Sequence, residues 1–476
     1  MGKYTRLGKN TALVFLGSAG AKLMSLFMLP FYTRWLTLAD YGSVDLIGIY
    51  SGLLLGIVSC TIFDALFIFP KDQPYEKKRE YFSSGIGFAL MTITGMALIC
   101  WLVRTLGKAN EWHGFVFEYL WLIFGLLAIS YVQQVTQQFI RSLDKMLVYS
   151  MTGIIQTATS ILFSFLLIPR WGIEGYVSSM VLGNAIALVY SMIRSGAYRY
   201  LHIRGISRNA VCEMLRYSIP LIPNGLMWFL ISSLNRPVLE TCSGLTAVGL
   251  FAVAGRFPNL LNTLYLLFQQ AWLISVLEEA KKPTYEQFYN KMLKLVVVVQ
   301  SLMAVLLAFS GKWIIELFTT PDYHSAWQYI PLLVISVIFM NVATFVGSNF
   351  AVTRESKYYF YSTIWSGGAS LLLNLALIPV FSIWGACCAA LISQAIGMAM
   401  RIKYSWKSAR ITDLGFFFKN SIFLFGSVAI CLLLQGTWIM YLCMGGMCLY
   451  FYIINYRPIN RVIVYIKNHE IYNRYR

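Results

Sequence analysis

The sequence is poor in charge and in the residue patterns that usually carry catalysis. Asp, Glu, Lys and Arg make up only 12% of the 476 residues, about half their share in a soluble protein. The four histidines, at positions 113, 202, 324 and 469, are scattered, and no pair has metal-ligand spacing. No glycine-rich phosphate loop with its Lys-Ser/Thr is present. These absences argue against a large soluble domain, a metalloenzyme and direct use of ATP.

Long apolar runs take the place of charge. Hydrophobic residues make up 58% of the chain, and runs of about 20 residues recur, each long enough to cross a ~30 Å hydrocarbon layer. We predict an all-α polytopic membrane protein with about 14 transmembrane helices. Its first apolar run is too long for a cleavable signal peptide and is expected to stay as helix 1. The predicted spans are 10–33, 42–68, 84–106, 115–139, 147–168, 175–197, 217–235, 246–275, 293–317, 327–351, 359–379, 384–400, 416–434 and 437–455.

The net charge of +18 is explained by topology. With both termini in the cytoplasm, the inner segments hold 30 of the 38 basic residues and the outer loops hold 6, Arg236 among them. Lys22 and Arg256 remain inside the membrane. This distribution follows the positive-inside rule, so nucleic acid is not an expected partner. The nine cysteines show no paired extracellular spacing, which argues against a disulfide framework.

Two pairs of similar segments indicate an internal duplication. Residues 167–190 and 377–400 share 7 of 24 residues at an offset of 210, beginning with Leu-Ile-Pro in both. Pro30 and Leu38-x-x-x-Gly42 return as Pro237 and Leu245-x-x-x-Gly249 at an offset of 207. A six-helix unit has an even number of spans, so its two copies would be parallel repeats. The predicted organisation is an N-terminal lobe at 1–197, a cytoplasmic linker at 198–216, a C-terminal lobe at 217–401, and helices 13 and 14 with a basic tail at 402–476.

Polar side chains form stripes on several predicted spans. A lysine at the bilayer centre costs at least a few kcal/mol, so the stripe with Lys22 at its middle demands an explanation. Stripes facing a hydrated cavity between the lobes would provide one, whereas interhelical hydrogen bonding alone is the alternative. The glycine pattern Gly48-x-x-x-Gly52-x-x-x-Gly56 in the second predicted span is interpreted as close backbone packing. The candidate cavity residues are Ser18, Lys22, Ser25, Gln134, Gln138, Asn224, Trp228, Asn235, Arg256 and Asn259.

Four features resemble a known family. They are "YTRWLTLADYGSVDL" after helix 1, its weaker copy "SGLTAVGLFAVAGRF", the pair "LIPRWGIEG" and "LIPVFSIWG", and the layout of fourteen spans. Together they resemble the polysaccharide transporter family, the O-antigen and capsule repeat-unit flippases. That family belongs to the multidrug/oligosaccharidyl-lipid/polysaccharide exporter superfamily.

The resemblance implies a V-shaped, two-lobed fold with a cationic central cavity. It implies transfer of an undecaprenyl-diphosphate-linked oligosaccharide to the outer leaflet of the bacterial cytoplasmic (inner) membrane, with no cofactor and no enzymatic reaction. Lys22 and Arg256 occupy places comparable to the basic cavity residues of related flippases. Members often carry an acidic residue where this chain has Asn235, which puts a proton or sodium role there in doubt.

Two other function classes stay open at this point. One is a cation-coupled multidrug or small-molecule antiporter of the same superfamily, whose members mostly have twelve spans and often acidic cavities. The other is a scaffold for polysaccharide assembly, whose partners would be a polymerase and glycosyltransferases. Fourteen spans with two intramembrane cations favour the anionic, lipid-linked substrate.

Overall fold

The computed structural model describes residues 26–111, 114–202, 205–280, 282–406 and 410–434, with residues 20 and 24 and single positions between 439 and 456. Throughout these residues the regular structure is helical, without strands. The chain divides into two compact units. Unit 1 comprises Met1–Phe229 with Ser243–Gly249, and unit 2 comprises Leu230–Cys242 with Leu250–Arg476.

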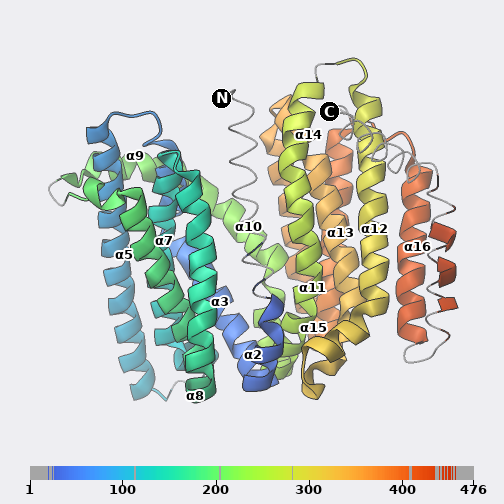
Figure 1. Ribbon diagram of the computed structural model, residues 1–476, viewed down its shortest axis with the longest axis horizontal. Helices are drawn as coiled ribbons and strands as arrows, with labels where there is room; N and C mark the ends of the chain where they lie inside the picture. The colour runs from blue at the N-terminus through green and yellow to red at the C-terminus, as the bar shows by residue number, and fades with distance from the viewer. Residues whose placement is uncertain are drawn as a thin grey trace, which may run out of the picture. The chain divides into compact units, whose positions relative to one another are not determined.

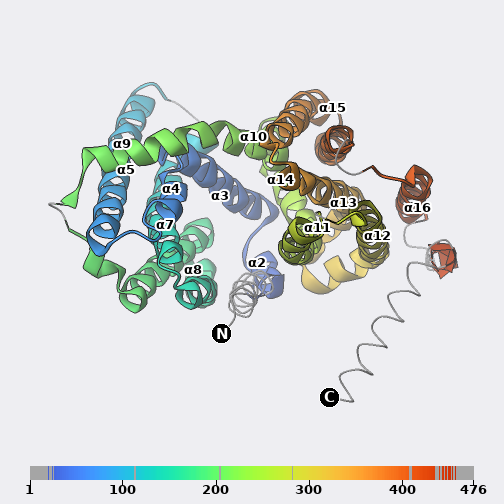
Figure 2. The ribbon, with the colours of Figure 1, turned by 90° about the horizontal axis from the view of Figure 1, so that it is seen from above.

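Figures 1 and 2 show the helices of both units. They are α2 (Leu29–Trp35), α3 (Leu38–Val58), α4 (Ile62–Ile68), α5 (Tyr75–Ala109), α6 (Phe115–Glu118), α7 (Leu120–Ser142), α8 (Met146–Ser195), η1 (Ala197–Tyr200), α9 (Arg208–Ser218), η3 (Ile219–Leu221), α10 (Ile222–Ser232), α11 (Asn235–Glu279), α12 (Tyr285–Phe318), η4 (Pro321–Tyr329), α13 (Ile330–Gly347), α14 (Asn349–Thr353), α15 (Ser356–Ser405) and α16 (Leu414–Leu433).

Nine stretches of the described residues are long and apolar enough to cross a membrane. Three of them, α8, α15 and the stretch Arg208–Glu279, contain a non-helical residue at which the chain turns back. Each of these three therefore supplies two spans, which brings the described part of the chain to twelve. Most of the predicted helix 1 and about half of the predicted helix 14 lie outside the described residues. The predicted class, an all-α polytopic membrane protein, is confirmed.

The turns inside α8 and α15 fall at equivalent positions of the predicted repeat. Gly172 has φ 52° and ψ −122°, and Ser382, 210 residues later, has φ 49° and ψ −126°. A Cβ atom on Gly175 would overlap the carbonyl oxygen of Leu167, and the corresponding pair in α15 has the same close approach. Residues eight apart would be about 12 Å apart in a straight helix, so each element is an antiparallel hairpin. The 210-residue offset is confirmed at these hairpins.

Helix α3 begins with a capping box formed by Thr37 and Asp40. The Thr37 side chain accepts a hydrogen bond from the Asp40 backbone N–H, and the Asp40 carboxylate accepts one from the Thr37 backbone N–H. This reciprocal arrangement satisfies two of the backbone donors that a helix start leaves free. It fixes the first turn of α3, where Leu38 and Gly42 lie.

The two copies of the Leu-x-x-x-Gly motif pack against each other within unit 1. A Cβ atom on Gly42 would overlap the Leu245 carbonyl oxygen, and one on Gly249 would overlap the Leu38 carbonyl oxygen. Each glycine therefore lets the other helix approach to backbone contact. Among the described residues, a Cβ on any of the 48/52/56 glycines meets nothing within 4 Å, so close packing at these three glycines stays a prediction.

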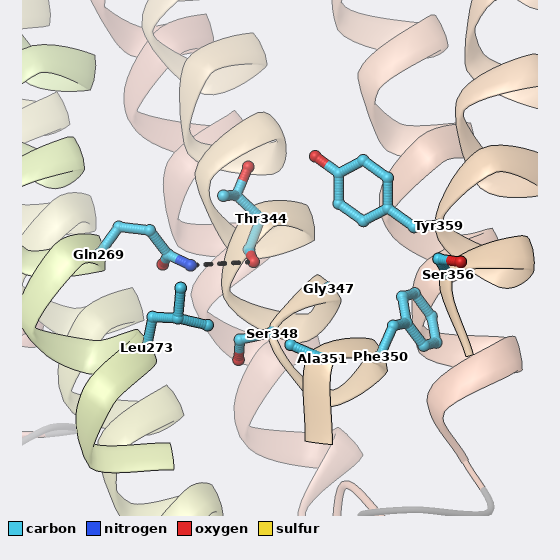
Figure 3. Close-up of a pocket in the computed structure, with 9 residues that line it drawn as sticks. All are labelled: Gln269, Leu273, Thr344, Gly347, Ser348, Phe350, Ala351, Ser356 and Tyr359. Carbon is cyan, nitrogen blue, oxygen red and sulfur yellow. Dashed lines mark hydrogen bonds between the residues drawn. The ribbon is translucent and has the colours of Figure 1, made fainter. Parts of the chain in front are cut away.

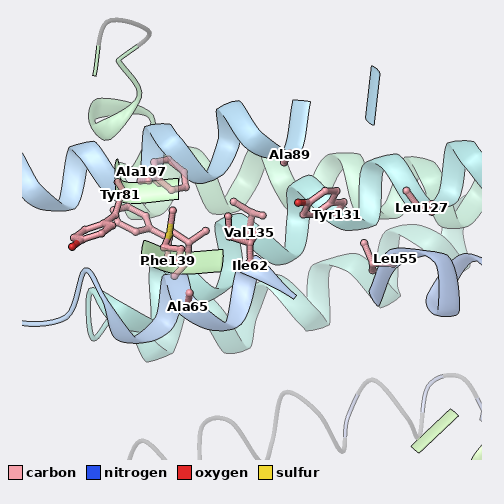
Figure 4. Close-up of a cluster of buried hydrophobic side chains, with 14 residues drawn as sticks. Leu55, Ile62, Ala65, Tyr81, Ala89, Leu127, Tyr131, Val135, Phe139 and Ala197 are labelled. Carbon is pink, nitrogen blue, oxygen red and sulfur yellow. The ribbon is translucent and has the colours of Figure 1, made fainter. Parts of the chain in front are cut away.

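The core of unit 1 is aromatic and includes the segment predicted as the linker (Figure 4). The Phe82 ring stacks on Phe139 with centroids 4.1 Å apart. Helix α9 lies across α4 and α5 (Figure 2) and buries Met214 in this cluster. The Tyr81 hydroxyl donates to the Glu213 carboxylate at 2.8 Å. Most of the predicted linker, namely the part after η1, therefore packs against the other helices of unit 1.

In unit 2, helix α16 is anchored on α12. The Lys294 ammonium lies 2.6 Å from the Asp413 carboxylate, just before α16 begins. The Asn290 side chain donates to the Arg410 carbonyl at 2.8 Å and accepts from the Thr412 N–H at 3.0 Å. These contacts fix the entry of a span that has no counterpart in the repeat.

Candidate functional site: an arginine cluster within the spans

The turn at Gly244 brings two polar segments of unit 2 together. Gly244 has φ 79° and ψ 173°, a conformation that favours glycine. The Arg236 guanidinium lies 5.2 Å from the centroid of the Phe251 ring. Fifteen residues of straight helix would separate them by about 22 Å. The chain therefore doubles back at Gly244, and Arg236 lies about 12 Å from the turn along its own arm.

Arg236 is the centre of this cluster. One of its terminal nitrogens donates to the Ser232 carbonyl at 3.0 Å and to the Asn235 side-chain oxygen at 3.3 Å. A Cβ atom on Gly255 would lie 3.9 Å from its other terminal nitrogen and 4.0 Å from the Asn259 amide nitrogen. We call Asn235, Arg236, Phe251 and Asn259 the Arg236 cluster. It combines a guanidinium, two amides and one aromatic face.

Arg256 follows Gly255 in the helix and precedes Asn259 of the cluster by three residues. Its side chain is half-buried, whereas Asn235 is buried and Asn259 is exposed. Arginine keeps its charge under all ordinary conditions. A guanidinium within a spanning helix is therefore stabilised by water or by anionic groups. The two arms of this hairpin carry one arginine each, Arg236 and Arg256, which makes this part of unit 2 suited to an anionic ligand.

Arg236 was missed as a site residue, since the sequence analysis placed it in an external loop. The helical segment Asn235–Ser243 puts it inside the span instead. The signal was in the sequence: Asn224, Trp228 and Ser232 are spaced by four residues, and Arg236 continues the same spacing. Residues four apart share one face of a helix. The apolar count alone ended the predicted span at residue 235, eight residues before the helical arm ends at Ser243.

The other predicted residues divide between the units. Asn235, Arg256 and Asn259 belong to unit 2, whereas Gln134, Gln138, Asn224 and Trp228 belong to unit 1 and are half-buried. Ser18, Lys22 and Ser25 lie outside the described residues. The structure thus brings Asn235 and Asn259 together, and the common cavity for the full set remains a prediction.

The amides of α7 have neighbours of their own in unit 1. Gln138 accepts a hydrogen bond from Arg141 at 2.9 Å. Gln133 donates to Gln156 at 2.9 Å, and Gln156 donates to Asn184 at 2.6 Å. The sequence left open whether such polar residues line a cavity or make interhelical hydrogen bonds. For Gln133, the structure contains the interhelical hydrogen bond. Within the described part of the chain, no group of three His, Cys, Asp or Glu side chains is arranged to hold a metal ion.

A multi-pass helical bundle built from repeats, with cationic and amide side chains inside its spans, is typical of membrane transporters. The model of the family "Polysaccharide biosynthesis protein" matches residues 7–274. This chain belongs to that family.

Two relatives agree with this assignment. The "Lsg locus putative protein 1" of Haemophilus influenzae is 23% identical over 375 residues, which cover 74% of this chain and 79% of that protein. The "Capsular polysaccharide biosynthesis protein CapF" of Staphylococcus aureus is 22% identical over 246 residues. That alignment covers 50% of this chain and 56% of CapF, so it spans about half of each protein.

Solved structures with the same fold are transporters. The lipid II flippase MurJ in an inward closed conformation has a TM-score of 0.67 at 16% identity, covering 95% of this chain and 100% of MurJ. An inward-facing multidrug transporter of the MATE family, in the MOP superfamily, has a TM-score of 0.61 at 14% identity, covering 86% and 99%. At these identities the likeness is one of fold. It makes the chain a multi-pass membrane protein with the fold of flippases and exporters.

Proposed function

We propose that this protein is a flippase for an undecaprenyl-diphosphate-linked oligosaccharide, which it moves from the cytoplasmic to the external leaflet of the bacterial cytoplasmic membrane by alternating access. The observation that carries the proposal is the Arg236 cluster of unit 2, in which a guanidinium lies among two amides, with Arg256 on the second arm of the same hairpin. The family and the MurJ fold support it. In this proposal both termini are cytoplasmic and the protein transports its substrate without chemically changing it.

The chemistry of such a substrate matches the residues. A diphosphate carries about two negative charges and cannot cross hydrocarbon unaided, and charge-assisted hydrogen bonds from guanidinium groups would hold it. Amides such as Asn235 and Asn259 suit sugar hydroxyls, and the Trp228 ring suits the apolar face of a sugar. The polyprenyl tail would stay in lipid while the head group crosses. Lys22 on helix 1 is proposed as a further cation for the diphosphate.

The alternative is a cation-coupled multidrug or small-molecule antiporter, which the MATE-family neighbour favours by its fold. The two proposals differ in the charge of the ligand. Cationic drugs would be repelled by Arg236 and Arg256, whereas a diphosphate would be attracted. Replacing either arginine with alanine would therefore weaken transport of an anion and leave or improve transport of a cation.

The test is deletion of the gene, followed by analysis of lipid-linked intermediates. The flippase proposal predicts that undecaprenyl-linked oligosaccharide accumulates on the inner leaflet, and that the intact gene restores export. Unchanged lipid-linked pools together with new drug sensitivity would support the antiporter instead.

Site variants sharpen this test. We expect Lys22→Ala to reduce export by about tenfold or more, because a charge-assisted contact to the diphosphate is lost, and Lys22→Arg to retain part of it. Arg236→Ala should act in the same direction. Lys403→Ala, an exposed position, is the matched control. Normal export by Lys22→Ala at equal protein level would remove Lys22 from the mechanism.

The orientation is tested by cysteine labelling of intact cells. In a background without native cysteines, an impermeant reagent should reach a cysteine at position 108 and not one at position 403. The reverse pattern would invert the proposed topology.

A further inference from the structure

A third arginine of unit 2, Arg401, is buried far from the Arg236 cluster. Arg401, near the end of α15, is only 5% exposed. Its Nε donates to the Ser362 hydroxyl at 3.2 Å, and its guanidinium carbon lies 4.2 Å from the centroid of the Tyr359 ring. Its two terminal nitrogens make no hydrogen bond to any residue that the structure describes. The guanidinium is thus positioned by one hydroxyl and one ring, with its two strongest donor groups unused.

No carboxylate compensates this charge in the described part of the chain. None lies within 4.0 Å of the Arg401 nitrogens, whereas Lys294 of the same unit has Asp413 at 2.6 Å. Leaving a buried charge without a partner is strongly unfavourable, and arginine does not escape by losing its proton. A counter-ion from outside the chain would remove this cost.

A cavity of about 320 Å³ lies next to the Tyr359 ring on which Arg401 stacks, entirely within unit 2 (Figure 3). Gly347 and Tyr359 both line this cavity. A Cβ atom on Gly347 would lie 3.2 Å from the Tyr359 ring and 3.4 Å from a terminal nitrogen of Arg401. The missing side chain at Gly347 therefore leaves the guanidinium close to the cavity. The volume is at the lower end of the range for small-molecule sites.

Hydrogen-bond donors line the same cavity. The Tyr359 hydroxyl points into it across from Thr344 (Figure 3), and this hydroxyl has no hydrogen-bond partner among the described residues. Ser356, another lining residue, is the first residue of α15, so the positive end of that helix dipole lies at the edge of the cavity. Gln269 and Ser348, by contrast, already bond Tyr265 and Trp272.

The charges at the start of α15 are mostly basic. Arg354 and Lys357 flank Ser356, with Glu355 between them. Gln269 follows Arg256 by thirteen residues, or about 20 Å along α11. The cavity therefore lies well away from the Arg236 cluster and is a site of its own.

We propose that this cavity binds a phosphate group, held by the Arg401 guanidinium, the Tyr359 hydroxyl and the first turn of α15. A planar guanidinium fits two phosphate oxygens at once, and the remaining oxygens accept from the hydroxyls and the helix start. The phosphate belongs either to the head group of an anionic lipid or to a soluble phosphate. This inference does not depend on the proposed flippase activity.

Native mass spectrometry of the purified full-length protein tests the site. The titrants are short-chain phosphatidic acid, inorganic phosphate, and phosphatidylcholine as the zwitterionic control. We expect the wild type to bind one of the two phosphate probes in preference to phosphatidylcholine. Preference for phosphatidic acid identifies a lipid ligand, and binding of inorganic phosphate alone identifies a soluble one.

Three variants tie the binding to this cavity. Arg401→Gln should weaken it about tenfold or more, and Tyr359→Phe, which keeps the ring beside the guanidinium, about threefold. Gly347→Ala should weaken it while keeping Arg401. Lys403→Gln removes an exposed charge from the same helix and should bind like the wild type.

The outcomes that overturn the proposal are equally defined. Wild-type protein that binds neither phosphate probe, or Arg401→Gln that binds as the wild type does, contradicts it. If Arg401→Gln does not fold, wild-type binding by both Tyr359→Phe and Gly347→Ala contradicts it.

Discussion

The hairpins α8 and α15 are copies of one another with different polar interiors. Both contain 50 residues and turn back at positions 210 apart with nearly the same backbone angles. In α8 the two arms are joined by neutral groups, with the Ser164 and Ser179 hydroxyls 2.9 Å apart and Gln156 bonded to Asn184. In α15 the arms are joined by Ser366, which donates to the Ser393 carbonyl at 2.9 Å, and by Arg401.

This difference shows that backbone and polar interior are separable. The turn requires a positive φ and close arms, and both copies keep these features. Arg401 corresponds to Ser191 at the same offset, a buried serine that donates to the Leu188 carbonyl at 2.9 Å. Unit 1 therefore has a small neutral group where unit 2 has a cation and a cavity. The same scaffold can hold a structural contact in one half and a ligand site in the other.

The prediction with the largest expected effect places an arginine at the equivalent position of unit 1. Ser191→Arg would bury a guanidinium where unit 1 has a small buried hydroxyl that donates to the Leu188 carbonyl, and we expect a loss of about 3–5 kcal/mol of stability. The measurement is the fraction of folded protein in fluorescence-detected size-exclusion chromatography. Arg401→Ser, the reverse exchange, should remain folded. A stable Ser191→Arg protein would show that the two interiors are interchangeable.

The next test compares the two copies of the Leu-x-x-x-Gly motif. Gly42→Leu and Gly249→Leu each force a side chain into the other helix's backbone, and should cost about 1–3 kcal/mol or more. Thermal unfolding in detergent would show two similar decreases in Tm. Gly48→Leu, on the open face of α3, is the matched control and should change Tm little. Unequal losses for the two motif glycines would mean that the contact is not reciprocal.

The two hairpin turns should differ in their contribution to stability by a smaller free energy. Ser382 adopts φ 49° without the freedom of glycine, which costs on the order of 1 kcal/mol. We therefore expect Ser382→Gly to raise Tm and Gly172→Ser to lower it, by similar free energies. Thermal unfolding of both variants and of the double exchange measures this. A lower Tm for Ser382→Gly would show that the serine side chain contributes more than the turn costs.

The smallest expected change in stability concerns the anchoring of α16, a helix that has no counterpart in the first half of the chain. The hydrogen bond from Lys294 holds the pKa of Asp413 below its usual value. The pair therefore stabilises the folded protein above the ordinary pKa of aspartate, and this stabilisation is lost as pH falls through the lowered pKa. Asp413→Asn keeps the cap on Phe416 and should cost less than about 1 kcal/mol, because the pair is partly exposed.

The corresponding measurement is the difference in Tm between wild type and Asp413→Asn. It should be small and positive at pH 7 and disappear toward pH 3. A difference independent of pH would assign the effect to the cap rather than to the charge.

Local patterns in the sequence were sufficient to predict the membrane spans and the internal repeat. An apolar run of about 20 residues predicts a membrane helix whatever surrounds it, and the Leu-Ile-Pro echoes located both hairpin turns. The stripe of Asn224, Trp228 and Ser232 even pointed to Arg236, although the predicted boundary excluded it.

The tertiary structure alone decided which faces meet. The sequence offered three glycines on α3 at helical spacing, yet the backbone contact is made by Gly42. It placed Arg401 at the edge of a cytoplasmic segment, yet the side chain is buried beside Tyr359 and Gly347. These outcomes depend on residues tens to hundreds of positions away, because burial and charge compensation are set by the neighbouring helices. Helical periodicity determines which residues share a face, and only the packing of the helices determines what that face contacts.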